Sequence, residues 1–237
     1  MMTTSMKYKA VIFDLFGTLV DEYDTLGYAS ALRETSSILK LRHDDFQKIW
    51  HETNWQRNAG GFKNIEENLQ YICRALNQPV KPFDINLAKM VRYDFLAPLL
   101  TPRLYAAETL STLKKAGYKL GLISNSSIDI PDLWPGTPLA PYFDVTVFSC
   151  ACGFMKPDPA IYRLAMEQLD VEPEECFFVD DNVGNLIASA SLGMKAVLME
   201  TLEEKDPYRP ARPQPEEWTG RRIKDLPEIL DILEEFK

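Results

Sequence analysis

The chain has 237 residues, of which 46% are hydrophobic, so it can bury the core of one large domain or of a core with a smaller insertion. Its formal net charge of -9 at pH 7 excludes a broad cationic surface for nucleic acids or anionic membranes, so any bound anion must be held locally. No apolar run approaches the length of a membrane span, and residues 1–9 lack the apolar core of a signal peptide. We therefore expect a cytoplasmic protein with no nucleic-acid or membrane partner.

Cysteine and histidine residues are too few and too scattered to predict a metal or redox site. The chain has four cysteines, and the nearest two in sequence, Cys150 and Cys152, lack the spacing and the partners of a zinc site. Only His43 and His51 are available for a histidine-based metal site or a catalytic triad. We expect the four cysteines to be reduced residues of the core.

The first predicted element is a strand that ends in an aspartate. Val11, Ile12 and Phe13 form an apolar run typical of a strand that is covered on both faces. Asp14 follows this run, and Gly17 allows the backbone to turn sharply just beyond it. Open α/β sheets bind their ligands at the carboxyl edge, so Asp14 is expected at a ligand site. Taken alone, an aspartate that only caps the following turn is at least as good an interpretation.

The segment from residue 21 to residue 99 is predicted to be a helical insertion. Apolar residues recur there at spacings of three and four, which is typical of amphipathic helices. Four ranges carry this pattern: 26–39, 44–57, 65–76 and 85–95. Aromatic residues of this segment, such as Trp50 and Trp55, line a pocket or belong to the core, and the core is the commoner place for aromatics at helical spacing.

Helices and strands alternate after Pro102. The predicted strands are 119–123, 143–149, 176–179 and 195–199, and the predicted helices are 104–116, 160–169 and 226–236. The proline-rich stretch from Pro207 to Pro215 is expected to be a loop. With the first strand, this pattern predicts an α/β fold: a Rossmann-like core of residues 1–20 and 100–237 around a parallel five-stranded sheet, with residues 21–99 inserted.

Polar residues follow two more of the predicted strands. Ser124 and Asn125 bring a hydroxyl group and free backbone N–H groups to the sheet edge, although such residues also form ordinary turns. Lys156 lies where a loop meets the start of a helix. Its ammonium group could hold a phosphate oxygen and a nucleophilic carboxylate together, and the alternative is a solvated surface lysine.

Two adjacent acids, Asp180 and Asp181, follow the strand 176–179, and Asn185 follows them. Adjacent carboxylates at a strand end repel each other, and a hard divalent cation such as Mg²⁺ would relieve that repulsion. The alternative is a helix N-cap with one further acid in the first turn.

Taken in order, these stretches resemble the four motifs of the haloacid dehalogenase-like hydrolase superfamily. The stretch from Asp14 to Thr18 is similar to the first motif, Asp-x-Asp/Tyr/Phe-Gly-Thr, in the form DxFGT. Ser124 is similar to the second motif, the run from Lys156 to Pro159 to the third, Lys-Pro-x-Pro, and Asp180-Asp181 to the fourth. The resemblance covers nearly the whole chain, and it implies that residues 21–99 are the helical cap of a capped member.

The resemblance also implies residue roles in a hydrolase. Asp14 would attack the substrate, and water would then hydrolyse the covalent aspartyl intermediate. The catalytic residues would be Asp14, Ser124 and Lys156, and the substrate-binding residues would be Gly17, Thr18, Ser124, Asn125 and Lys156. In the phosphatase branch, Mg²⁺ would be held by Asp14, the Phe16 backbone carbonyl and Asp181, with support from Asp180 and Asn185.

One position departs from the phosphatase pattern. Most phosphatases of this family have a second aspartate two residues after the nucleophile, where it protonates the leaving oxygen, and this chain has Phe16 there. The dehalogenase branch has a tyrosine at this position, but it works without metal, typically has Ser-Ser in place of Asp180-Asp181, and has an arginine where this chain has His51. Arg57 could substitute for that arginine. We favour a Mg²⁺-dependent phosphatase of a small phosphorylated metabolite, and the alternatives are a 2-haloacid dehalogenase and a binding or regulatory protein with little activity.

Overall fold

The computed structural model of the chain describes residues 7–21, 25–201 and 217–236. Its centre is a sheet of six strands in which all neighbouring strands are parallel. The strands are β1 (Ala10–Phe13), β2 (Lys119–Ser124), β3 (Val145–Phe148), β4 (Cys176–Asp180), β5 (Lys195–Met199) and β6 (Arg221–Ile223). They lie in the order β3-β2-β1-β4-β5-β6, so the order reverses between β1 and β4. In open α/β sheets, ligands bind beyond the carboxyl ends of the strands at such a reversal.

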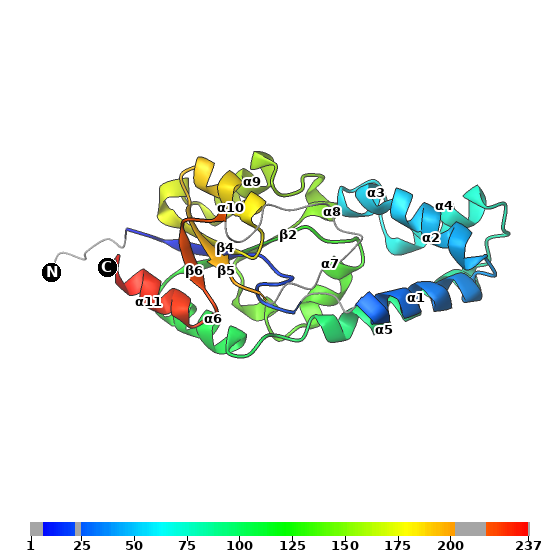
Figure 1. Ribbon diagram of the computed structural model, residues 1–237, viewed down its shortest axis with the longest axis horizontal. Helices are drawn as coiled ribbons and strands as arrows, with labels where there is room; N and C mark the ends of the chain where they lie inside the picture. The colour runs from blue at the N-terminus through cyan, green and yellow to red at the C-terminus, as the bar shows by residue number, and fades with distance from the viewer. Residues whose placement is uncertain (1–6, 22–24, 202–216, 237) are drawn as a thin grey trace.

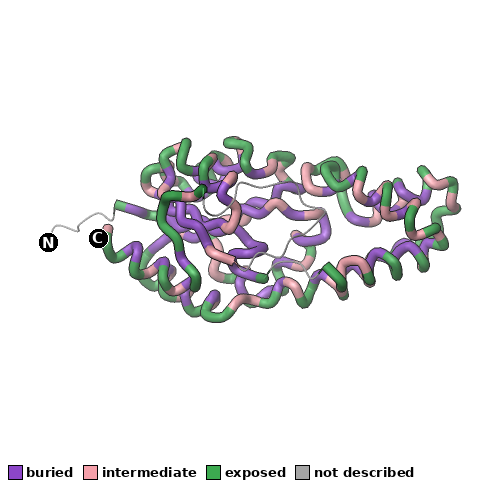
Figure 2. Tube along the Cα trace, in the orientation of Figure 1, coloured by how far each residue is buried: buried purple, intermediate pink, exposed green. Residues whose placement is uncertain are grey.

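Helices cover both faces of the sheet (Figure 1). α9 (Pro159–Leu169) and α10 (Val183–Ser191) pack on one face, and α6 (Ala106–Lys115) and α11 (Glu228–Glu234) pack on the other. In β1, Ala10 and Ile12 face α9 and α10, while Val11 and Phe13 face the opposite layer, as the two-residue period of a strand requires. All four are buried, which explains the uninterrupted apolar run, and Figure 2 shows this burial along the centre of the molecule.

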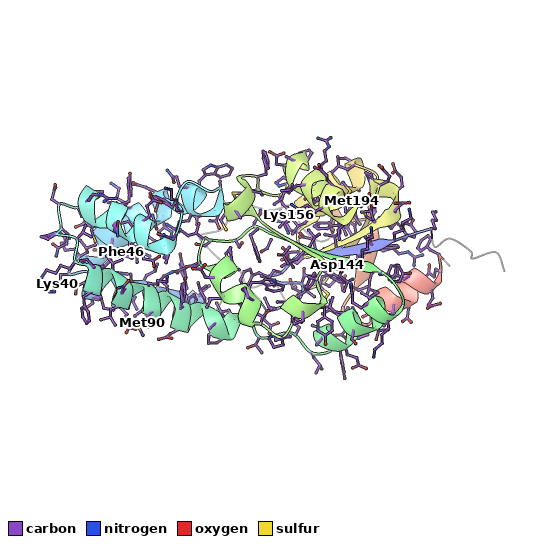
Figure 3. All side chains as sticks on the ribbon, turned by 180° about the vertical axis from the view of Figure 1, so that it is seen from behind. Lys40, Phe46, Met90, Asp144, Lys156 and Met194 are labelled. Atoms are coloured by element: carbon purple, nitrogen blue, oxygen red, sulfur yellow. The ribbon has the colours of Figure 1, made fainter. Side chains whose placement is uncertain are left out.

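The helical insertion lies at the end of the core that is opposite the two chain termini (Figure 1). Its helices are α1 (Thr25–Ile38), α2 (His43–Glu52), α3 (Asn54–Asn58), α4 (Ile65–Ala75) and α5 (Pro82–Leu99). Phe46 and Trp50 are buried in its interior with ring centroids 5.8 Å apart. Figure 3 shows Phe46 between the helices and Met90 on the outer side of the insertion. Trp50 is therefore a core residue, whereas Trp55 is 66% exposed.

The remaining short helices connect the strands to one another. α7 (Ile130–Leu133) follows the loop after β2, and α8 (Ser149–Cys152) follows β3 directly. Three further short turns are 3₁₀ helices: Trp134–Gly136, Ala140–Tyr142 and Pro173–Glu175. The four cysteines are free, as the sequence predicts, and Cys73, Cys150 and Cys176 are buried, but Cys152 is half-buried rather than in the core. None of the described helices is both long and apolar enough to cross a membrane.

The predicted fold class is confirmed, with one correction in the number of strands. β6 is a sixth strand that the sequence does not predict, because Arg221 and Arg222 are exposed and the strand has no apolar alternation. The predicted helix 44–57 is also divided into α2 and α3 at Thr53, whose hydroxyl group donates a hydrogen bond to the Ile49 carbonyl at 2.8 Å. The loop predicted for 207–215 lies outside the described residues, and the division into core and cap stays a prediction.

Candidate active site

β1 brings Asp14 to the carboxyl edge of the sheet, next to the reversal in strand order. The Asp14 backbone N–H donates to the Val179 carbonyl of β4 at 2.9 Å, so the residue is fixed between the two central strands. Gly17 follows with φ +85, and a Cβ atom built on it would lie 2.7 Å from Asp181 Oδ2. Only glycine fits this turn, because any side chain would be strained there and would collide with Asp181. The predicted glycine turn is confirmed.

Lys156 joins the Asp14 carboxylate to that of Asp180. Its Nζ atom is 2.5 Å from Asp14 Oδ1 and 2.7 Å from Asp180 Oδ2, and the lysine is buried, which excludes a solvated surface lysine. Asn125 fixes the lysine backbone, since its Oδ1 accepts from Lys156 N and its Nδ2 donates to Lys156 O, both at 2.8 Å. Figure 3 shows Lys156 in the core, on the side that is nearer to the insertion. The loops after β1, β2 and β4 and the loop before α9 therefore meet at one place.

Asp180 is held from several sides. Asn185 Nδ2 donates to both carboxylate oxygens, at 3.1 and 3.0 Å, and the Asn182 backbone N–H donates to Oδ1 at 2.7 Å. The N-cap of α10 is Asn182, whose side chain accepts from Gly184 N at 2.9 Å, so neither aspartate of the pair serves as the helix cap. This removes the capping alternative for the acidic pair.

The carboxylates of Asp14, Asp180 and Asp181 offer ligand atoms that all lie within 4.8 Å of one another. Asp14 and Asp180 are buried, and Asp181 is half-buried. Such a set of oxygen atoms is what a small hard cation such as Mg²⁺ prefers, and the absence of a Cβ atom at Gly17 leaves room for the Asp181 carboxylate. The residues present therefore fit a magnesium ion.

The charges at this edge strongly influence one another. Burial raises the pKa of the Asp14 carboxyl group above its usual range and Asp180 raises it further, whereas the Lys156 ammonium group lowers it. Burial lowers the pKa of Lys156, but the carboxylates of Asp14 and Asp180 outweigh that effect and raise it overall. A divalent cation beside these carboxylates would favour the ionised form of Asp14, which is the nucleophilic form.

Two hydroxyl groups that the sequence assigns to substrate binding are also buried. Ser124 ends β2, the strand beside β1, and Thr18 follows the glycine turn. Neither the Ser124 Oγ atom nor the Thr18 Oγ1 atom has a hydrogen-bond partner within the described ranges. A hydroxyl group in that state can donate to an anionic oxygen without first giving up another partner.

Phe16 lies in the same turn, but its side chain is part of the hydrophobic core. The residue is 8% exposed, and its ring belongs to the hydrophobic cluster that includes Leu15 and Leu19. Its backbone forms an isolated bridge with Val20. The side chain therefore packs against apolar neighbours, and a phenyl ring cannot transfer a proton.

The insertion contains buried cationic residues that the sequence does not single out, apart from Arg57. The Arg57 guanidinium lies over the Trp50 ring, 3.7 Å from its centroid, and donates to Thr53 Oγ1 at 2.7 Å. Arg92 lies over the same ring at 4.6 Å and forms a buried ion pair with Asp129 of the core, with 2.6 Å between Nη2 and Oδ2. The Arg92 contacts join residues far apart in the chain, so no local pattern predicts them, whereas the Arg57 contacts lie within two turns of helix.

The fold is a parallel α/β sheet, and three aspartates and one buried lysine meet at its carboxyl edge, where the strand order reverses. This combination is typical of an α/β enzyme. The family model described as haloacid dehalogenase-like hydrolase matches residues 8–193. The chain belongs to this hydrolase family.

Relatives in the family have different activities. Glyceraldehyde 3-phosphate phosphatase of Methanothermobacter thermautotrophicus is 27% identical over 201 residues, which are 81% of this chain and 86% of that protein. (S)-2-haloacid dehalogenase 4A of Burkholderia cepacia is 27% identical over 199 residues, which are 80% of this chain and 81% of that protein. A family enzyme of Bacteroides thetaiotaomicron, solved in complex with magnesium and inorganic phosphate, has a TM-score of 0.64 at 21% identity over 84% of this chain and 98% of its own. This last similarity supports the fold.

Proposed function

We propose that the protein is a Mg²⁺-dependent phosphatase that hydrolyses a small phosphorylated metabolite. The observation that carries the proposal is the cluster of Asp14, Asp180 and Asp181, with ligand atoms within 4.8 Å of one another. Three carboxylates this close repel one another when ionised, and Lys156 supplies only one positive charge to offset that repulsion, so a divalent cation would stabilise the ionised cluster further. The phosphatase relative and the magnesium- and phosphate-bound enzyme of the same fold support this function.

In this proposal Asp14 is the nucleophile. One of its oxygens forms a bond to phosphorus while the bond from phosphorus to the leaving oxygen breaks, and water then hydrolyses the aspartyl phosphate. Lys156 fixes the carboxylate through its 2.5 Å contact and shares its charge with the transferring group. The Ser124 hydroxyl and the Asn125 backbone N–H donate to phosphoryl oxygens, and the turn at Gly17 and Thr18 completes the binding site.

Asp14, the Phe16 carbonyl and Asp181 would hold the magnesium ion. Both oxygens of Asp180 already accept hydrogen bonds, from Lys156, Asn185 and Asn182, so Asp180 supports the site by holding Lys156. When bound, Mg²⁺ offsets the repulsion between the anionic nucleophile and the anionic phosphate.

The helical insertion, residues 21–99, would be the cap of a capped member with the DxFGT motif. Phe16 gives this enzyme no proton donor two residues after its nucleophile, so leaving groups that need protonation should react slowly. We further propose that the enzyme is cytoplasmic, monomeric or homodimeric, and without a nucleic-acid or membrane partner.

The dehalogenase alternative is not favoured. A relative carries that name, and an aromatic residue at position 16 would suit halide departure, which needs no proton. However, the paired acids Asp180 and Asp181 replace the serines typical of that branch, and His51 stands where the branch has its halide-binding arginine. Arg57, the possible substitute, is stacked on Trp50 inside the insertion.

A substrate screen tests the proposal. Phosphate release from a panel of phosphorylated metabolites and chloride release from 2-chloropropionate are measured with Mg²⁺ and with EDTA. We expect phosphate release that requires Mg²⁺, and neither product from Asp14→Asn. Chloride release that is equal in Mg²⁺ and EDTA, without any phosphate release, would overturn the proposal in favour of a dehalogenase.

A further inference from the structure

The two chain segments that connect the core to the insertion are joined beside the active site. Val20, on the outgoing segment, forms an isolated antiparallel bridge with Pro102 on the returning segment. The Arg103 backbone N–H donates to the Leu19 carbonyl at 2.9 Å. The insertion therefore leaves and re-enters the core through two neighbouring segments that are hydrogen-bonded to each other.

The Arg103 side chain extends this connection to the turn that follows the nucleophile. Its Nη1 atom donates to the Gly17 carbonyl at 3.0 Å, and its Nε atom is 3.3 Å from Asp21 Oδ1. The Asp21 side chain is 86% exposed, so this ion pair contributes little on its own, whereas the Arg103 side chain is only 23% exposed. The contact with Gly17 is therefore the more important of the two.

Gly17 in turn is in close contact with Asp181. A Cβ atom on Gly17 would lie 2.7 Å from Asp181 Oδ2 and 2.8 Å from its Cγ, so the turn and the carboxylate pack without spare room. The Gly17 N–H donates to the Val20 carbonyl at 2.9 Å, and its own carbonyl accepts from Arg103. The N–H and the carbonyl of Gly17 are therefore both hydrogen-bonded to residues of the two segments that connect the core to the insertion.

We propose that Arg103 is a positioning residue that holds the Gly17 turn against Asp181 and so links the insertion to the metal-binding carboxylates. The inference rests on the magnesium site of the proposed function. Mg²⁺ requires nearly ideal octahedral geometry, so a small shift of the turn lowers metal affinity before it affects the fold. Residues that orient metal ligands typically change affinity by about 10–100-fold when they are replaced.

Metal binding measured without substrate tests the inference. Mn²⁺ is titrated into the full chain and its free concentration is followed by electron paramagnetic resonance. We expect Arg103→Met to weaken Mn²⁺ binding by about tenfold or more, and Arg103→Lys to recover part of the loss because an ammonium group can still donate to the Gly17 carbonyl. Two substitutions should change Mn²⁺ affinity by less than about twofold. One is Asp21→Asn, and the other is the control Arg221→Met, which removes an exposed ion pair between Arg221 of the edge strand β6 and Glu235.

The outcomes separate this inference from the proposed function. If the unchanged chain binds no Mn²⁺, the metal site itself is wrong. If it binds Mn²⁺ and the folded Arg103→Met variant binds equally well, the role of Arg103 is wrong while the metal site stands. Should Arg103→Met fail to fold, Arg103→Ala decides, because it also lacks a donor for the Gly17 carbonyl: weaker binding at an unchanged unfolding temperature supports the inference, and unchanged binding overturns it.

Discussion

The sheet edge and the helical insertion both bury charged side chains, but they hold them in different ways. At the sheet edge, Lys156 lies between Asp14 and Asp180, and each carboxylate is placed by the end of a strand. In the insertion, Arg57 and Arg92 lie over the Trp50 ring, and these side-chain contacts pack α3 and α5 against α2. The sheet edge owes its geometry to backbone pairing, and the insertion owes its geometry to side-chain contacts. Substitutions at the sheet edge should therefore lower turnover, and substitutions of the buried charges in the insertion should lower the free energy of unfolding.

The largest effect is expected from Asp14→Asn. An amide is a poor nucleophile of nearly the same shape, so turnover should fall on the order of 10⁴-fold or more while the unfolding transition stays cooperative. The matched control is Asp158→Asn, at the exposed N-cap of α9, because asparagine caps a helix as well as aspartate does. Turnover by a cleanly purified Asp14→Asn protein at the normal rate would exclude Asp14 as the nucleophile.

Arg92→Met tests the insertion side of the comparison. The substitution leaves Asp129 buried without its guanidinium partner, and breaking a buried pair costs about 3–5 kcal/mol of unfolding free energy, measured by urea denaturation. Lys48→Met, which removes an exposed pair with Glu52, should cost less than about 0.5 kcal/mol. The double variant Arg92→Met/Asp129→Leu should recover part of the loss, since it leaves no buried charge. A loss below about 1 kcal/mol in Arg92→Met would show that the pair does not stabilise the insertion on the core.

Asp181→Ala tests the proposed magnesium site at the sheet edge. Loss of one carboxylate ligand should lower Mg²⁺-dependent turnover by at least about 100-fold and remove the response to added Mg²⁺, as followed by phosphate release over a metal titration. The fold should be unaffected because the side chain is half-buried at the end of a strand. Activity that persists in EDTA would instead favour metal-free chemistry.

The smallest effect is expected from Phe16→Asp, which supplies the missing proton donor. Turnover of alkyl phosphates should rise by about tenfold or more, and that of nitrophenyl phosphate should rise less, because nitrophenolate leaves without a proton. Phe16→Asn is the matched control, since it removes the same buried ring without adding an acid. Equal alkyl-to-aryl ratios in the two variants would mean that the carboxyl group does not act as an acid there.

The sequence by itself determined the sheet edge. The carboxyl ends of parallel strands meet at one edge, so Asp14, Lys156 and Asp181 could be expected together from the positions of their strands and loops, and the structure brings them into one cluster. The glycine turn was also predictable, because its backbone conformation is a local property of Gly17. These features depend on backbone geometry, which short stretches of sequence encode directly.

Only the tertiary structure decided the contacts between distant segments. Arg92 and Asp129 are far apart in the sequence, as are Arg103 and Gly17, and neither pair belongs to a periodic pattern. β6 could not be foreseen either, because two exposed arginines become a strand only when the edge of β5 is there to pair with them. The physical reason is common to all three: each contact forms between surfaces that exist only after the elements have packed, so no local propensity encodes it.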